Sequence, residues 1–106
     1  MGSENYRVRY TPLAYEDLDE IDTYISSVLL NPPAALNLLG EIEESVNRLQ
    51  QFPFIGSAAE DPYLASKGYR KLVVQNYLVF YLADQVQKEI VVMRVIYGAR
   101  EYRSLL

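Results

Sequence analysis

Residues 67–100 read KGYRKLVVQNYLVFYLADQVQKEIVVMRVIYGAR. Three runs within this stretch, 69–74, 77–83 and 90–97, are made largely of Val, Ile, Leu, Tyr and Phe, which suit a pleated, half-buried surface. Gln75-Asn76 leaves a two-residue connection of the hairpin type, in which Asn is able to adopt a positive φ, and residues 84–89 form a longer loop. The stretch therefore predicts an antiparallel meander of three strands.

Both faces of this meander are apolar near its centre. Strict alternation places Leu78, Phe80 and Leu82 on the face opposite Tyr77, Val79 and Tyr81. In the third run it separates two further sets, which are Ile90, Val92, Arg94 and Ile96 on one face and Val91, Met93, Val95 and Tyr97 on the other. A sheet with one solvated face alternates more cleanly, so we expect at least partial cover on the second face as well.

A short strand and a first helix precede the meander. Residues 6–10 alternate strictly and predict a strand whose inward side chains are Tyr6, Val8 and Tyr10. Thr11 is a good helix cap, and Pro12 fits the first helical position. The helix that follows carries an apolar stripe at helical spacing, formed by Ala14, Leu18, Ile21, Ile25 and Val28.

A second helix follows with a very short link. Asn31-Pro32-Pro33 ends the first helix and opens the next, and Phe52-Pro53 ends the second. Its apolar stripe consists of Ala35, Leu38, Leu39, Ile42, Val46 and Leu49. Such a link predicts an antiparallel helical hairpin whose apolar faces need a sheet to pack on.

The element order β-α-α-β-β-β predicts an α+β fold, with the helical hairpin packed on one face of a small antiparallel sheet. Residues 54–68 show no periodic pattern and are expected to form a loop, and residues 99–106 are expected to form a short C-terminal helix or a frayed end. At 106 residues we expect one domain, 1–106. Met1-Gly2-Ser3 is typical of an expression-tag remnant and carries no weight.

The composition excludes several kinds of chemistry. The chain has no cysteine and no histidine, which removes disulfides, thiol nucleophiles, the commonest metal ligand and the commonest general acid–base. We therefore expect no metal and no other cofactor. No apolar run reaches about 18 residues and no signal peptide is evident, so we expect a cytoplasmic protein that does not enter a membrane.

Charge is distributed unevenly along the chain, whose net charge is −4. Residues 1–66 hold three basic and 11 acidic residues, whereas residues 67–106 hold seven basic and three acidic residues. The overall acidity argues against a general nucleic-acid binder, while the basic C-terminal part permits a local contact with phosphate or with an acidic partner. Solvated, Glu-rich helix faces would explain the same distribution without any partner.

In this order the elements and motifs resemble the RelE/ParE superfamily of bacterial type II toxins, also known from plasmid stabilisation systems. The resemblance extends from Tyr6 to about residue 103. The motifs that carry it are Tyr6-x-Val8, Leu18-x-x-Ile21-x-x-Tyr24-Ile25, Leu49-x-x-Phe52-Pro53-x-x-Gly56, Gly68-Tyr69-Arg70-x-Leu72, Asn76-Tyr77-x-x-x-Tyr81 and Arg94-Val95-x-Tyr97-Gly98-x-Arg100.

The resemblance implies a toxin that arrests growth and is neutralised by a co-encoded antitoxin. It leaves the mechanism open between a ribosome-dependent mRNA interferase and a non-enzymatic inhibitor of DNA gyrase or another protein, with a decayed toxin that only binds antitoxin as a third alternative. The match is incomplete where RelE-like nucleases carry an arginine after the first tyrosine of the middle strand, because this chain has Leu78. Many relatives have histidine at the position of Tyr97 and a basic residue at the position of Ala99, and this chain has neither. Lys71 does match a basic residue that these nucleases often carry on the preceding strand, and Arg100 matches the arginine that closes their last strand.

Metal-independent RNA cleavage by 2′-hydroxyl attack would need a base, an acid and cations for the phosphate. Arg100, Arg94 and Lys71 are the candidate cations, since guanidinium and ammonium groups stabilise phosphate charge. Arginine does not deprotonate in proteins, which leaves Tyr97, Tyr102, Glu101 or Lys71 for proton transfer. The structural alternatives are an acid partner for Arg94, a loop-anchoring role for Arg70, and core positions for Tyr77 and Tyr81.

The meander also predicts a docking surface. If the helices cover one face, the other would leave open a patch on the order of several hundred Å², which is rarely tolerated in a lone domain. We expect an antitoxin segment with apolar anchors, and with acids facing Arg94, Arg100 or Lys71, to bind Leu78, Phe80, Leu82, Ile90, Val92 and Ile96. If the helices take that face instead, the exposed set becomes Tyr77, Val79, Tyr81, Val91 and Met93. Self-association as a homodimer is the rival occupant.

Overall fold

A computed structural model describes residues 5–100 and 102–106, so Met1–Ser3 and Glu101 lie outside the described residues. Five strands form one sheet in the order β1-β5-β4-β3-β2. They are β1 (Arg7–Tyr10), β2 (Ser57–Ala58), β3 (Arg70–Val74), β4 (Tyr77–Asp84) and β5 (Glu89–Tyr97). The helices are α1 (Pro12–Thr23), which continues into a π-helical segment (Tyr24–Val28), then α2 (Pro32–Arg48), α3 (Pro62–Ser66) and a terminal 3₁₀ turn (Arg103–Leu105).

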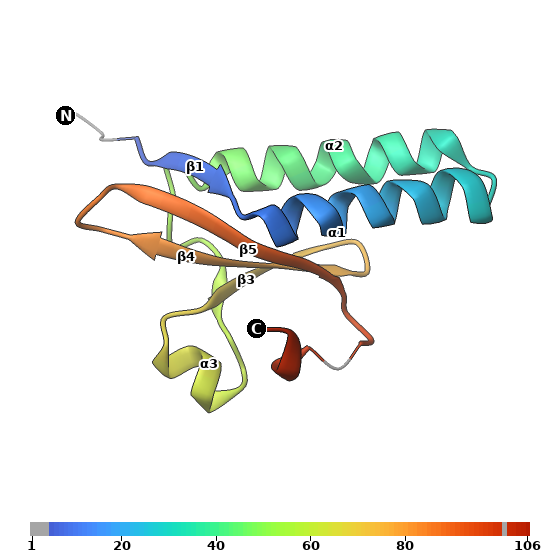
Figure 1. Cartoon of the computed structure of the whole chain (residues 1–106). Coiled ribbons are helices and arrows are strands. Elements are labelled where there is room, and N and C mark those ends of the chain that lie inside the picture. The colour runs from blue at the N-terminus through green and yellow to red at the C-terminus, as the bar shows by residue number, and fades with distance from the viewer. Residues whose placement is uncertain (1–4, 101) are drawn as a thin grey trace.

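The predicted α+β architecture is confirmed, but the sheet has β2 as an additional strand and is not purely antiparallel. The meander β3-β4-β5 and the pair β2-β3 are antiparallel, but β1 pairs in parallel with β5, so the sheet is mixed. Figure 1 shows α1 and α2 side by side on one face of the sheet and α3 with the C-terminal turn on the other. Among the described residues, no helix is long and apolar enough to cross a membrane.

The helical hairpin forms where its caps and stripes predict. The Thr11 hydroxyl accepts a hydrogen bond from the Ala14 amide, and the Asn31 side chain accepts one from the Ala34 amide. The predicted stripes face the sheet, and their buried members are Ala14, Ile21, Ile25, Ala35, Leu38, Ile42, Val46 and Leu49. Val28 is the exception: the π-helical segment widens the last turn and rotates Val28 away from the stripe to the surface.

A bulge in β5 changes the alternation of the meander. Phe80 lies opposite Arg94, but Tyr81 lies opposite Val92, so Met93 is the additional residue. Val92 and Val95 therefore both face the helices together with Val79, and the strict alternation predicted through β5 is wrong beyond this point. The β3-β4 turn also differs in detail, because Gln75 and not Asn76 adopts the positive φ, at 54°.

The second face of the sheet is covered by the chain itself. Phe80 and Ile96 are buried there beneath Leu64 of α3, Tyr69 and the C-terminal Tyr102, joined by Ala59, Leu78, Leu82, Met93, Leu105 and Leu106. Much of this cover comes from residues 54–68, which were expected to be a structureless loop. The segment instead contains β2 and α3, whose N-cap Asp61 accepts hydrogen bonds from the Tyr63 and Leu64 amides. Cover on the second face is thus confirmed, and the expected open patch is absent from the described residues.

Candidate functional site

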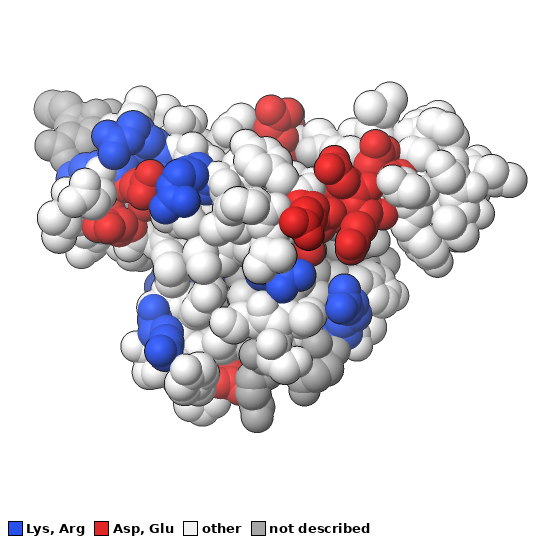
Figure 2. Space-filling model, in the orientation of Figure 1, with Lys and Arg blue, Asp and Glu red and all other residues white. Residues whose placement is uncertain are grey.

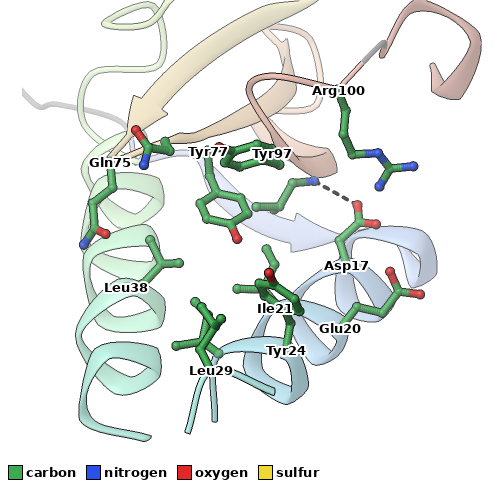
Figure 3. Close-up of a pocket in the computed structure, with 13 residues that line it drawn as sticks. Asp17, Glu20, Ile21, Tyr24, Leu29, Leu38, Gln75, Tyr77, Tyr97 and Arg100 are labelled. Carbon is green, nitrogen blue, oxygen red and sulfur yellow. Dashed lines mark hydrogen bonds between the residues drawn. The ribbon is translucent and has the colours of Figure 1, made fainter. Parts of the chain in front are cut away.

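A groove of about 660 Å³ lies between the helical hairpin, the β3-β4 turn and the C-terminal end of β5 (Figure 3). Apolar side chains form its floor, namely Ile21, Ile25, Leu38 and Val95, with Leu29 beside them. Three tyrosines, Tyr24, Tyr77 and Tyr97, line its walls, and its polar members are Asp17, Glu20, Gln75, Asn76 and Arg100. An apolar floor with a few polar groups at the mouth is typical of a binding site.

The tyrosines are placed by the sheet and by the π-helical segment. Tyr77 and Tyr97 lie directly opposite each other at the ends of β4 and β5, and their rings meet edge to face with centroids 5.6 Å apart. Burial, followed by the neighbouring Tyr97 and Tyr24, raises the pKa of Tyr77 above its ordinary value. The hydroxyl of Tyr77 therefore stays protonated at neutral pH and is suited to hydrogen bonding rather than to general-base catalysis.

Asp17 at the groove edge has a structural partner. Its carboxylate accepts hydrogen bonds from Nε and Nη2 of Arg94, at 2.8 and 2.9 Å, and from the Val95 amide at 2.9 Å. Arg94 also donates from Nη1 to the Leu105 carbonyl at 2.9 Å. The hydrogen bond to Asp17 raises the pKa of Arg94 despite the opposing effect of burial. The predicted alternative for Arg94, an acid partner on a neighbouring element, is confirmed.

Lys71 lies on the other face of the sheet. It sits opposite Phe80, which in turn sits opposite Arg94, so the three side chains form a row across three strands. The Lys71 ammonium is 3.6 Å from the Glu60 carboxylate, and the Tyr102 ring packs on Phe80 with centroids 4.9 Å apart. Phe80, on which Tyr102 packs, therefore lies between the two cations, each of which has an acid partner.

The predicted catalytic residues are thus divided between two faces. Arg100 and Tyr97 line the groove on the helix side, whereas Lys71 and Tyr102 lie on the side covered by the C-terminal segment. Arg94 starts from that second side, but its guanidinium is bonded to Asp17, which lines the groove. The predicted antitoxin-binding residues are divided as well. Val92 is buried against the helices and Phe80 beneath the C-terminal segment, with Leu78, Leu82 and Arg94 partly buried on Phe80's side. Ile90 and Ile96 are also buried.

Two motif residues have the structural roles considered for them. Arg70 anchors the loop after α2 by donating hydrogen bonds from Nη2 to the carbonyls of Phe54 and Gly56. Tyr81 is fully buried, and its hydroxyl donates to the Pro53 carbonyl at 2.9 Å and accepts from the Gly56 amide at 3.1 Å. The spacing Phe52-Pro53-x-x-Gly56 is therefore a packing feature of this loop.

Several groove residues were not predicted as functional from the sequence. The sequence indicates no functional role for Glu20 or Leu29, and it places Tyr24 only within a family motif. The π-helical segment Tyr24–Val28, which carries Tyr24 and precedes Leu29, has no local sequence signature. The sequence predicts a turn at Gln75 and Asn76, and Asn76 also belongs to a family motif, but neither is predicted to line a site. Among residues 5–100 and 102–106, no cluster of three or more acidic side chains is arranged to hold a metal ion.

Residues 8–102 match the sequence model of a family described as the ParE toxin of the type II toxin–antitoxin system parDE. The chain belongs to this family. A solved structure of the chromosomal ParDE system from P. aeruginosa is 28% identical to this ParE-family chain, with a TM-score of 0.72, and the match covers 90% of this chain and 98% of that one. The RelBE2 toxin–antitoxin complex from Mycobacterium tuberculosis shares the fold at 23% identity, with a TM-score of 0.63 and coverage of 93% and 98%. The comparison with curated proteins gave no match.

Proposed function

We propose that this ParE-family toxin arrests growth by binding a protein target in the cytoplasm, with DNA gyrase as the first candidate, and that a co-encoded antitoxin neutralises it. The observation that carries the proposal is the separation of the basic residues. Lys71 and Arg94 each face a carboxylate and are separated by Phe80. Arg100 lines the groove beside Asp17, the partner of Arg94, and lies on the face of the sheet away from Lys71. Phosphoryl-transfer chemistry needs several cations that converge on one phosphate.

The groove supports binding in place of catalysis. Its floor is aliphatic, its tyrosines are suited to amphipathic contacts, and aromatic residues with arginine are the residue types enriched in interface hot spots. Arg100 is exposed at its mouth, so truncation of Arg100 removes an interface contact without disturbing the core.

For the antitoxin, the structure of the second sheet face suggests a route. Leu78, Phe80 and Leu82 belong to the apolar cluster that Tyr102, Leu105 and Leu106 join, and the Tyr102 ring packs on Phe80. An antitoxin segment that binds Phe80 would therefore replace the C-terminal segment of the toxin. The replaced side chains would be Tyr102, Leu105 and Leu106. Val92 has no part in this surface, because it faces the helices.

A ribosome-dependent mRNA interferase is the second candidate, favoured by the placement of Tyr97 and Arg100 at one groove. Induction in bacteria separates the two functions. With wild-type protein we expect plasmid supercoiling to fall before the rate of protein synthesis changes, and with Arg100→Ala we expect both effects to be lost at equal protein level. An early fall in protein synthesis with unchanged supercoiling would contradict gyrase as the target and favour the ribosome.

A further inference from the structure

Three consecutive aliphatic side chains face solvent at the end of the first helix. Val28, Leu29 and Leu30 are 63%, 54% and 80% exposed, and we refer to them as the aliphatic tip. A regular α-helix would have kept Val28 on the buried stripe, and the π-helical segment Tyr24–Val28 turns it outward. π-helical turns of this kind occur frequently at functional sites.

Leu30 is placed at a backbone position that disfavours it. Its φ is 56°, in the left-handed region that glycine and asparagine adopt readily and leucine does not. The Asn31 amide donates to the Ile25 carbonyl across this residue, which is the arrangement that ends many helices and that normally contains glycine. An exposed leucine here costs backbone energy and gains no burial, so folding alone does not explain it.

The aliphatic tip adjoins two hollows that share residues. Leu29 lines the groove of about 660 Å³ described above. Val28 lines a second hollow of about 330 Å³, together with Asp19, Glu20, Thr23 and Tyr24. Glu20 and Tyr24 belong to both hollows, which makes the groove, the tip and the second hollow one continuous surface.

The charge of this surface is set by α1. Glu16, Asp19 and Glu20 are exposed on the helix, and Figure 2 shows the acidic side chains gathered over α1. Asp17 is neutralised by Arg94, and Arg100 is the cation that lines the groove. The surface is therefore apolar in its floor and predominantly acidic along one side, which disfavours a phosphate backbone as its ligand.

We propose that this surface docks a basic amphipathic helix of the toxin's protein target, a step that rests on the proposed binding function. Apolar residues of the helix occupy the groove and contact the aliphatic tip, and its Lys or Arg residues face Glu16, Asp19 and Glu20. An added strand does not fit, because α1 already occupies the adjacent edge of β5 through Thr11 and Asp17, which bond to the backbone of Val92, Met93 and Val95. A second copy of this chain would bring like-charged α1 surfaces together.

The test uses the full chain and a designed probe, so it does not depend on toxicity or on gyrase. The probe is a labelled peptide of about 18 residues with Leu at helical i, i+3, i+4 and i+7 positions and Lys on both flanks. Its twin has every Lys replaced by Glu. We expect the basic peptide to bind about tenfold more tightly than the acidic twin in fluorescence anisotropy, and amide chemical-shift changes to map to α1, the aliphatic tip and the β3-β4 turn.

Charge-reversal variants distinguish binding at this surface from a general attraction of the basic peptide to an acidic protein. Asp19→Lys combined with Glu20→Lys should weaken binding of the basic peptide about tenfold, whereas Glu44→Lys, on the exposed face of α2, should change it less than twofold. Leu30→Gly should weaken binding severalfold without lowering the thermal midpoint of unfolding. Equal binding of the two peptides, or equal loss from the Glu44→Lys change, would overturn the proposal.

The two proposals fail in different ways. A protein that binds the basic peptide at this surface but leaves gyrase active would contradict the proposed target and retain the docking surface. A protein that inhibits gyrase but shows no preference for the basic peptide would contradict the docking surface alone. A stable homodimer in sedimentation that buries the aliphatic tip would also overturn the docking proposal.

Discussion

Asp17 of α1 and Arg94 of β5 form a two-pronged ion pair with N···O distances of 2.8 and 2.9 Å, although 77 positions separate them in the chain. Both side chains are largely buried, and Asp17 also accepts the Val95 amide while Arg94 holds the Leu105 carbonyl. The pair therefore connects three parts of the fold, which are the first helix, the last strand and the C-terminal segment.

We predict that Asp17→Ala lowers the free energy of unfolding by about 3–5 kcal/mol, because it leaves the Arg94 guanidinium buried without its partner. Urea denaturation followed by circular dichroism measures this change. Asp19→Ala, on the exposed side of the same helix, is the matched control and should change the value by less than about 0.5 kcal/mol. Similar effects of the two substitutions would show that the ion pair is not structural.

Gly56 is expected to tolerate no side chain. A Cβ at this position would lie 2.6 Å from the Lys71 carbonyl oxygen and 2.7 Å from the Tyr81 hydroxyl, both of which are fixed by the sheet and the loop. We predict that Gly56→Ala destabilises the protein by about 1–3 kcal/mol. Gly40→Ala in α2, where the added Cβ meets nothing within 4 Å, should stabilise it by up to about 1 kcal/mol. Equal effects of the two substitutions would contradict the packing of the Pro53–Gly56 loop.

Leu30 should be dispensable for folding. Glycine adopts the φ of 56° without strain, so Leu30→Gly is predicted to leave the free energy of unfolding unchanged or to raise it by up to about 1 kcal/mol. Leu36→Gly replaces another exposed leucine, within α2, and is predicted to lower the same quantity by about 1 kcal/mol. Thermal and urea denaturation of the two variants give the comparison. A loss at Leu30 as large as at Leu36 would indicate a structural role for this leucine.

Alkaline pH should destabilise the fold through Tyr10. Burial, with smaller effects of Glu43 and Tyr15, raises the pKa of Tyr10 from 10.0 to about 12. Between these values the unfolded chain releases the phenolic proton more readily than the folded protein, so this contribution to stability is present below pH 10 and is lost as the pH rises towards 12. Tyr10→Phe should reduce the slope of stability against pH in this window, as measured by urea denaturation at a series of pH values. An unchanged slope in the Tyr10→Phe variant would show that Tyr10 does not contribute to the loss of stability at alkaline pH.

The parts of the fold that depend on local pattern are predictable from the sequence. Thr11-Pro12 and Asn31-Pro32 start the two helices because capping and proline geometry act over a few residues. The meander follows in the same way from β-rich runs separated by short turns. The parallel pairing of β1 with β5 is different, since it joins residues more than 80 positions apart and no local signal encodes it.

The features of the candidate site that differ from the sequence prediction come from local irregularities in one strand and one helix. The additional Met93 in β5 and the π-helical segment at Tyr24–Val28 each shift the phase of a periodic pattern, and periodicity alone cannot reveal such a shift. Arg100 and Tyr97 were predicted as functional from the sequence and do line one groove. Their separation from Lys71 depends on which face of the sheet the helices cover. Because both faces of the meander are apolar in the sequence, the pattern does not show which face that is.

Lys71 and Arg100 lie on opposite faces of the sheet, and a reconstituted translation assay tests whether this division prevents RNA cleavage. Purified toxin is added to ribosomes programmed with a defined mRNA, and cleavage is mapped by primer extension, with a parallel reaction on free RNA in EDTA. We predict intact mRNA in both reactions at a toxin concentration that inhibits purified gyrase. Ribosome-dependent cleavage that Arg100→Ala abolishes would contradict the proposed binding function and assign the groove to RNA chemistry.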